Sequence, residues 1–253
     1  MNYEKRRKRI VKYLQKKEIS GFLITQPENR RYLCGFVDGD HGIGESSGAL
    51  LVTVTGKSFF FTDFRYKIQA QNEVADAEIV MYPKGLTTLL STLLPDLKLS
   101  SLAFESHYFL YSEVKKLKKA GRKAGFKLHP TTHIIEDMRI IKDCDELDTI
   151  KDSVKLNEKV FSKVYQEIIP KMTELELALL IETTMKKMGA EGASFNSIVA
   201  SGKNSALPHA TPTKKKIAKN LPLTIDMGCI LKGYCSDMTR TFIPGHKTTK
   251  KYR

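Results

Sequence analysis

The sequence predicts two domains in succession, an α/β domain over residues 1–131 and an α+β domain over residues 132–253. In the first part, short apolar runs typical of strands alternate with helical patterns, which favours a layered α/β arrangement. In the second part, two helices with clear start signals precede a single hairpin. A length of 253 residues is sufficient for two ordinary domains, each with its own buried core.

The first domain is expected to alternate between strands and helices. Pro27 suits the first turn of a helix, and Thr62 or Asp63 suits the N-cap of another. Predicted strands occupy 21–25, 49–54, 58–62, 77–82, 101–105 and 126–130. Predicted helices occupy 4–17, 27–35, the segment that starts near 63, 86–94, and 111–121, the last ending at Gly121.

Two helices with capping-box starts are predicted in the second domain. The first begins at Asp143 with Glu146 three residues later and ends at Pro170. The second begins at Thr173 with Glu176 three residues later and ends at Gly189. Predicted core positions of the first helix are Leu147, Ile150, Val154, Val160 and Val164. The stretch TTHIIEDMRIIKD before these helices is interpreted as a linker.

Composition and charge narrow the class of protein. The hydrophobic fraction of 41% and the charged fraction of 28% are typical of a soluble globular protein. No apolar run approaches the ~20 residues that span a bilayer, so we expect no membrane contact. The basic N-terminus lacks the apolar core of a signal peptide, so we expect a cytoplasmic protein. The formal net charge of +14 comes from lysines spread over helix faces without interleaved aromatic residues, which argues against nucleic-acid binding. The four cysteines show no zinc-like spacing.

The residues from 221 to 243 predict a β-hairpin. Apolar residues alternate with polar ones along its first strand: Leu223, Ile225, Met227 and Cys229. The turn falls at Leu231-Lys232 or at Lys232-Gly233, and the second strand runs from Tyr234 to Ile243.

Asp226 and Asp237 are the candidate metal ligands on this hairpin. With the earlier turn the two aspartates lie directly opposite each other, and with the later turn Asp226 faces Thr239 while Asp237 is its diagonal neighbour. Both registers put the two carboxylates on one face, whereas a three-residue loop would separate them. Like charges so placed are destabilising unless one is protonated or a cation lies between them, and divalent cations favour carboxylate oxygens. Two solvated aspartates on an exposed hairpin are the alternative.

Longer stretches resemble a known enzyme family. The run SIVASGKNSALPHATPT followed by IDMGCILKGYCSDMTRT resembles the M24 metallopeptidases, particularly the Xaa-Pro aminopeptidase and proline dipeptidase branch. In the first half, PENRRYLCGF and TDFRYKIQA resemble the creatinase-like N-terminal domain of that family. The resemblance implies a creatinase-like α/β domain over 1–131, followed over 132–253 by the N-terminal portion of an α+β pita-bread domain.

The same resemblance implies roles for individual residues. It implies that Asp226 binds one metal ion, that Asp237 bridges two, and that His209 of the N-S-A-x-P-H segment is a catalytic residue in contact with the substrate. The implied cofactors are two divalent ions (Mn²⁺, Co²⁺ or Zn²⁺), and the implied substrate is a peptide with proline at its second position. The implied chemistry is hydrolysis by a metal-activated water.

The family's remaining metal ligands have no counterpart in these 253 residues. They are a histidine in an H-x-x-G-H-G-type segment and two later glutamates, yet after Asp237 the sequence holds no Asp or Glu and one histidine, His246. We therefore expect an incomplete pita-bread domain, and a chain that is inactive as it stands. The alternatives are a catalytically dead pita-bread protein that acts as a binding module and a non-functional remnant. Because the last strand would expose unpaired backbone and the side chains of Phe242 and Ile243, we expect a chain that is soluble only as an oligomer, for which we predict a homodimer, or that aggregates.

Overall fold

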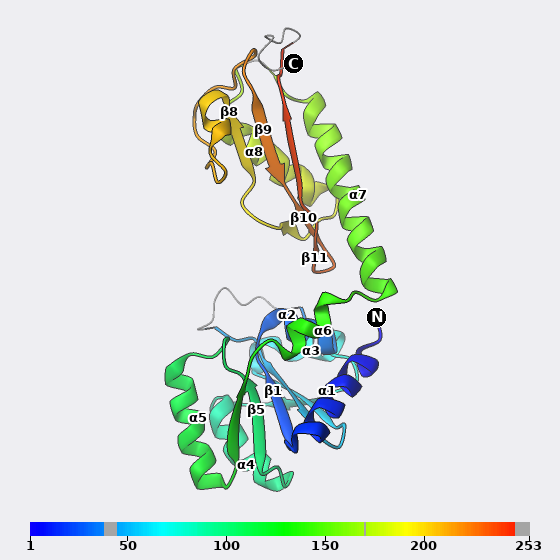
Figure 1. Ribbon diagram of the computed structural model, residues 1–253, viewed down its shortest axis with the longest axis vertical. Helices are drawn as coiled ribbons and strands as arrows, with labels where there is room; N and C mark the ends of the chain where they lie inside the picture. Colours follow the sequence, from blue (N-terminus) through cyan, green and yellow to red (C-terminus); the bar gives the residue numbers. More distant parts are fainter. Residues whose placement is uncertain (38–44, 170, 246–253) are drawn as a thin grey trace. The chain divides into compact units, whose positions relative to one another are not determined.

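The computed structural model describes residues 1–37, 45–169 and 171–245, and His246 lies outside them. The chain forms two compact units, Met1–Ile141 and Lys142–Arg253 (Figure 1). The first unit is an α/β layer structure and the second an α+β structure, as predicted.

A six-stranded sheet forms the centre of the first unit, in the order β4-β3-β2-β1-β5-β6. The strands are β1 (Gly21–Ile24), β2 (Ala49–Thr53), β3 (Ser58–Thr62), β4 (Glu78–Met81), β5 (Ser101–Glu105) and β6 (Lys127–Thr131). Strands β1, β5 and β6 run parallel to one another, β3 and β4 are parallel, and the hairpin strands β2 and β3 are antiparallel. All six predicted strands are confirmed.

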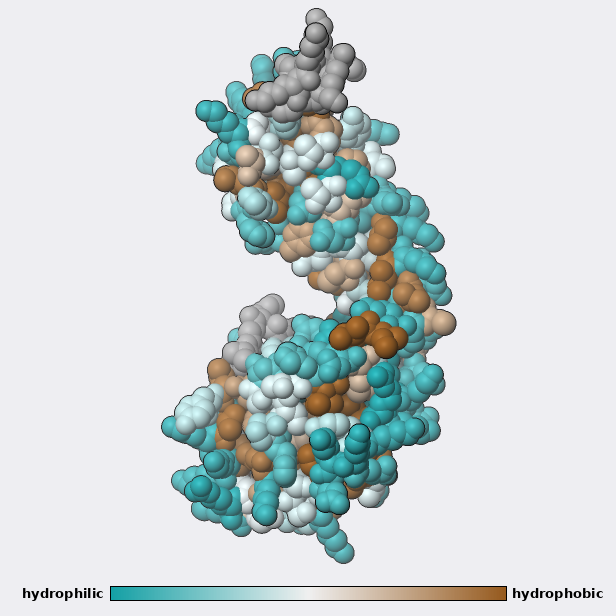
Figure 2. Space-filling view, in the orientation of Figure 1, coloured by the Kyte–Doolittle hydropathy of each residue, from teal (hydrophilic) through white to brown (hydrophobic). Residues whose placement is uncertain are grey.

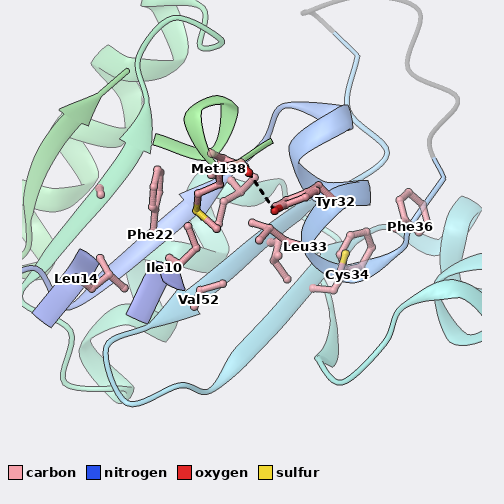
Figure 3. Close-up of a cluster of buried hydrophobic side chains, with 14 of the residues drawn as sticks. Ile10, Leu14, Phe22, Tyr32, Leu33, Cys34, Phe36, Val52 and Met138 are labelled. Carbon is pink, nitrogen blue, oxygen red and sulfur yellow. Dashed lines mark hydrogen bonds between the residues drawn. The ribbon is translucent and has the colours of Figure 1, made fainter. Parts of the chain in front are cut away.

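Helices cover both faces of this sheet, because successive side chains of its central strands point to opposite sides. Phe22 and Ile24 of β1 pack in one core with α1 (Tyr3–Lys17) and α2 (Pro27–Cys34), whereas Leu23 packs in a second core with α4 (Leu86–Asp96) and α5 (Tyr111–Ala124). Figure 3 shows the first core, in which Tyr32 Oη donates a hydrogen bond to Met138 O at 3.4 Å. The helices are α1 (Tyr3–Lys17), α2 (Pro27–Cys34), α3 (Lys67–Glu73), α4 (Leu86–Asp96), α5 (Tyr111–Ala124) and α6 (Ile134–Ile140), with the 3₁₀ turn η1 (Phe64–Tyr66) before α3.

Helix α6 corrects the interpretation of TTHIIEDMRIIKD as a linker. Its Ile135 and Met138 are buried in the first core, at 1% and 7% exposure. The first unit consequently extends to Ile141, beyond the boundary expected after residue 131. A pattern of two apolar side chains one turn apart was too short to separate a helix from an extended linker by periodicity.

The second unit combines two helices with two small sheets. Helices α7 (Cys144–Gln166) and α8 (Glu174–Lys187) both begin with the predicted capping boxes, Asp143 with Glu146 and Thr173 with Glu176. The strands are β7 (Gly192–Ala193), β8 (Ile198–Ser201), β9 (Leu223–Met227), β10 (Cys229–Leu231), β11 (Tyr234–Cys235) and β12 (Met238–Phe242), with the 3₁₀ turn η2 (Gly202–Ala206) after β8. They form sheets in the orders β12-β9-β8 and β11-β10-β7.

The inner face of α7 differs from the prediction in its N-terminal half. Val160 and Val164 are buried as predicted, but Leu147 and Val154 are 46% and 41% exposed. The buried positions there are Glu146, Ser153 and Asn157. These positions are polar because this part of the helix faces polar groups of the hairpin, which favour hydrogen-bond partners when buried. Ser153 and Asn157 donate to backbone carbonyl groups, and Glu146 accepts a hydrogen bond from a tyrosine hydroxyl.

Hydrophilic side chains predominate on the face of the molecule shown in Figure 2, with hydrophobic groups in scattered patches. This agrees with a highly charged chain of net charge +14. Among the described residues, no helix combines the length and the apolar character that crossing a membrane requires.

Candidate metal site

The hairpin closes at the later of the two turns considered. Leu231 pairs with Tyr234, and the two residues between them, Lys232 and Gly233, have φ of 47° and 74°. Two successive positive φ angles are typical of a type I′ turn, whose twist matches that of a hairpin. The same register continues through β9 and β12, where Asp226 is paired with Thr239.

Helices α7 and α8 pack against one face of the sheet β12-β9-β8, and Asp226 lies on the other face. Figure 1 shows this sheet with the two helices. The neighbouring Ile225 is fully buried against those helices, so Asp226 points to the opposite side, where it is half-buried. There Thr239 Oγ1 donates a hydrogen bond to Asp226 Oδ1 at 2.7 Å. In the next cross-strand pair on this face, the hydroxyls of Thr224 and Thr241 lie 3.0 Å apart. This open face of the sheet is therefore polar at both pairs.

A break in the first strand at Gly228 sets the position of Asp237. A side chain at Gly228 would collide with the Ser236 carbonyl oxygen and with Ser194 Oγ. Ser236 Oγ accepts a hydrogen bond from Cys229 N at 3.1 Å, so a side chain takes the place of a backbone partner at the break. Because Ser236 is fixed in this way, Asp237 follows it at a defined place beside Asp226.

Helix α7 donates hydrogen bonds to the two carbonyl groups that flank the break. Asn157 Nδ2 donates to Met227 O and Ser153 Oγ donates to Cys229 O, each at 3.1 Å. Both side chains are essentially fully buried, so these bonds are not exchanged with water. The polar inner face of α7 thus holds the strand in the shape that brings the two aspartates together.

Asp226 acts on the neighbouring carboxylate of Asp237. Partial desolvation and, next, the negative charge of Asp226 raise the pKa of Asp237. A divalent cation between the carboxylates would remove this repulsion, and carboxylate oxygens are ligands that such cations accept. The pair therefore fits part of a metal site. It is too small a set for two transition-metal ions, each of which needs several protein ligands.

His209 lies in an exposed turn after η2. Within the described residues it makes no hydrogen bond or ion pair, and no cluster of three potential metal ligands includes it together with Asp226 and Asp237. A hollow of about 290 Å³ between α7 and the start of β12 borders Asp237 and Thr239, but neither Asp226 nor His209 lines it.

Glu174 anchors the segment that carries His209, and sequence reasoning missed it. Its carboxylate is fully buried and accepts a hydrogen bond from Ser201 N at 2.7 Å, on the N-terminal side of His209 in the sequence. It also accepts hydrogen bonds from Thr213 N and Oγ1 at 3.1 and 2.6 Å, on the C-terminal side of His209. Asn204 Nδ2 adds contacts at 3.1 and 3.2 Å. The position of Glu174 in the first turn of α8 was the available signal, since helix N-termini favour a carboxylate, but the sequence does not show which donors it meets.

Both units match known families over nearly their whole length. Residues 6–141 match the Creatinase/Prolidase N-terminal domain, and residues 148–253 match metallopeptidase family M24. The chain is 33% identical over 227 residues to the uncharacterized peptidase YqhT of Bacillus subtilis, covering 90% of this chain and 62% of the relative. It is 29% identical over 244 residues to the Xaa-Pro dipeptidase of Pyrococcus horikoshii, covering 96% of this chain and 65% of the relative.

Solved structures agree with the sequence relatives. The Xaa-Pro dipeptidase from Bacillus anthracis superimposes with a TM-score of 0.88 at 31% identity, covering 99% of this chain and 67% of that one. The X-Pro aminopeptidase from Thermotoga maritima superimposes with a TM-score of 0.83 at 31% identity, covering 93% and 65%. The chain thus spans about two thirds of the length of the relatives that it matches. Its two units, a creatinase/prolidase N-terminal domain and a pita-bread domain, make it a member of the M24 metallopeptidase family, in the branch of the Xaa-Pro dipeptidases and aminopeptidases.

Proposed function

We propose that Asp226 and Asp237 are metal ligands of a hydrolytic centre for peptides with proline at the second position, and that His209 contacts the substrate. The observation that carries this proposal is the proximity of the two carboxylates on the open face of the second unit, where partial desolvation and, next, the charge of Asp226 raise the pKa of Asp237. Relatives of this chain are named for hydrolysis of Xaa-Pro peptides, which supports the substrate class.

Each residue around the carboxylates has a part in this proposal. When bound, divalent ions of this class supply Lewis-acid catalysis and an activated water. Thr239 donates to Asp226 and fixes the direction of its remaining oxygen lone pairs. Asn157 and Ser153 hold the strand break next to Asp237, and Glu174 fixes both ends of the segment with His209.

We also propose that residues 1–253 alone do not hydrolyse Xaa-Pro peptides. Two carboxylates leave most coordination positions of two metal ions unfilled. No Asp or Glu follows Asp237 in this sequence to supply the two glutamates that the family pattern requires. The two aspartates then bind one Mn²⁺, Co²⁺ or Zn²⁺ ion weakly, without catalysis.

Metal titration and a peptidase assay test the two statements separately. Isothermal titration with Mn²⁺ should show a weak site that depends on the two aspartates, so Asp226→Asn and Asp237→Asn should each weaken it at least tenfold. Asp148→Asn is the matched control, because its side chain is 73% exposed on α7 and pairs with a lysine of the same helix. Equal Mn²⁺ affinity in all four proteins would refute the ligand assignment.

The peptidase assay measures release of proline from a dipeptide with added Mn²⁺ or Co²⁺. We expect no turnover above the rate without protein. Turnover that disappears in Asp226→Asn but persists in Asp148→Asn would show that the site in this chain is complete, and would overturn the proposal of inactivity.

A further inference from the structure

The first unit gathers polar side chains at one edge of its sheet. Strands β1, β5 and β6 are parallel neighbours, so their carboxyl ends lie side by side. Gln26 follows β1, His107 follows β5, and His133 follows β6. Ligands of open α/β sheets bind outside the carboxyl ends of parallel strands, so this is the edge of the unit where a site is expected.

Three of the side chains at this edge converge. Potential ligand atoms of His107, His133 and Glu136 all lie within 4.8 Å of one another. His107 Nε2 is 3.2 Å from Glu136 Oε1 and 3.3 Å from Gln26 Oε1, and the imidazole rings of His107 and His133 stack with centroids 5.2 Å apart. Both histidines are exposed and Glu136 is half-buried, so the cluster is open to solvent on one side.

Buried groups behind the cluster hold Glu136 in place. Asn29 is fully buried and its Nδ2 donates to Glu136 Oε1 at 2.6 Å and to Glu105 Oε1 at 2.7 Å. Arg139 Nη1 donates in turn to Asn29 Oδ1 at 2.8 Å, which orients the amide. Ligand carboxylates in metal sites are typically oriented by such outer hydrogen bonds.

The surroundings of Glu136 lower the pKa of its carboxyl group. Desolvation acts to raise its pKa, but hydrogen bonds from its own backbone N–H, from Asn29 and from His107 outweigh this effect and lower it. A metal ion requires the deprotonated form of a carboxylate. The half-buried position therefore does not prevent Glu136 from acting as a ligand.

His133 has no other structural task in the described residues. It occupies the N-cap position of α6, yet its side chain makes no capping hydrogen bond and its φ is 60°. Residues that cap helices well are Ser, Thr, Asp and Asn, and a left-handed conformation is uncommon outside glycine. The imidazole is instead directed to the ring of His107.

We propose that His107, His133 and Glu136 bind one divalent transition-metal ion of the zinc class. Two imidazoles and one carboxylate are a ligand set that zinc accepts, with water or Gln26 at the fourth position. Donor atoms around tetrahedral zinc are about 3.4 Å apart, so binding requires a rotation of the two imidazoles. This site lies within the first unit and uses imidazoles, whereas the carboxylate pair Asp226 and Asp237 lies in the second unit.

Zinc affinity of the full 253-residue chain tests the proposal, measured by competition with a chromophoric chelator. We expect His107→Ala and His133→Ala to weaken one zinc site at least tenfold, and Glu136→Gln to do the same. His129→Ala is the matched control, because His129 is an exposed histidine on β6 outside the cluster, and it should bind zinc like the wild type. Asp226→Asn should leave the affinity of this zinc site unchanged, and this result would distinguish the site from the carboxylate pair in the second unit.

A second measurement protects the test against misfolded variants. During a zinc titration of the wild-type chain followed by NMR, the imidazole resonances of His107 and His133 should shift together at one equivalent, while those of His129 should not. Zinc affinity that is the same in His107→Ala, His133→Ala and His129→Ala, or imidazole resonances that do not respond to zinc, would overturn the proposal. The cluster would then be a pair of stacked histidines, one of them hydrogen-bonded to Glu136, and nothing more.

Discussion

Replacing Glu174 should strongly destabilise the second unit. The carboxylate is fully buried and accepts hydrogen bonds from Ser201, Asn204 and Thr213. Glu174→Ala removes all of these acceptors at once. The buried N–H of Ser201 would then lack a partner, at a cost of about 1–3 kcal/mol, and the bonds to Asn204 and Thr213 add about 1 kcal/mol each. The expected loss is about 3–5 kcal/mol, a large fraction of the stability of an ordinary domain.

Two further variants make this reasoning quantitative. Glu174→Gln retains one acceptor oxygen and should cost about half as much as Glu174→Ala. Glu176→Ala is the control in the same helical turn, because Glu176 is exposed and serves the capping box alone, so its loss should cost about 1 kcal/mol.

Hydrogen exchange of the amides in β9 is the appropriate assay, since it reports the opening free energy of the second unit independently of the first. A loss below about 1 kcal/mol in Glu174→Ala, or a loss equal to that of Glu176→Ala, would refute the account of Glu174 as the anchor of the segment with His209.

Three further predictions concern the hairpin, the thiols and the edge strand. Gly228→Ala should lower the opening free energy of the second unit by about 1–3 kcal/mol, because the added Cβ would overlap Ser236 and Ser194. Gly192→Ala is the control and should cost less, because no atom lies within 4 Å of its added Cβ. Equal losses in the two variants would contradict the close packing at Gly228. Burial raises the pKa of the Cys34 and Cys229 thiols to about 11, whereas Cys144 and Cys235 are exposed. A thiol reagent at pH 8 should therefore label the two exposed cysteines first, and rapid labelling of all four cysteines would contradict this. Among the described strands β12 pairs with β9 alone, so light scattering should show a dimer, and a strict monomer would refute the expected homodimer.

Features determined by a few neighbouring residues could be predicted from the sequence. Both capping boxes start their helices as expected, because the signal lies within four consecutive residues. The hairpin register follows from the two-residue turn at Lys232-Gly233, and it puts Asp226 opposite Thr239, one of the two arrangements considered.

Features that depend on distant partners could not be predicted. The inner face of α7 is polar because Ser153 donates a hydrogen bond to a carbonyl 76 residues away, whereas periodicity alone favoured Leu147 and Val154 as its core positions. Glu174 acquires its role from Thr213, 39 residues later. The role of Asp226 and Asp237 as metal ligands stays a prediction.

One local departure has a packing cause. The predicted end of α5 at Gly121 is wrong, because the helix continues to Ala124. Gly121 lies so close to the chain after the helix that a Cβ there would be 2.7 Å from Phe126 O. Here glycine serves close approach within a helix, and the left-handed cap is Gly125, with φ of 79°.

The short turn at Lys232-Gly233 also has a kinetic consequence. Asp226 and Asp237 belong to the same hairpin, so their approach needs no contact between distant parts of the chain. Hairpins close within about 1–10 μs, much faster than sheets assembled from remote strands. The repulsion between the carboxylates is therefore present from the first moments of folding. A divalent cation that binds this pair and not the unfolded chain would favour the closed hairpin by mass action, and would act on the folding of the second unit before any chemistry takes place.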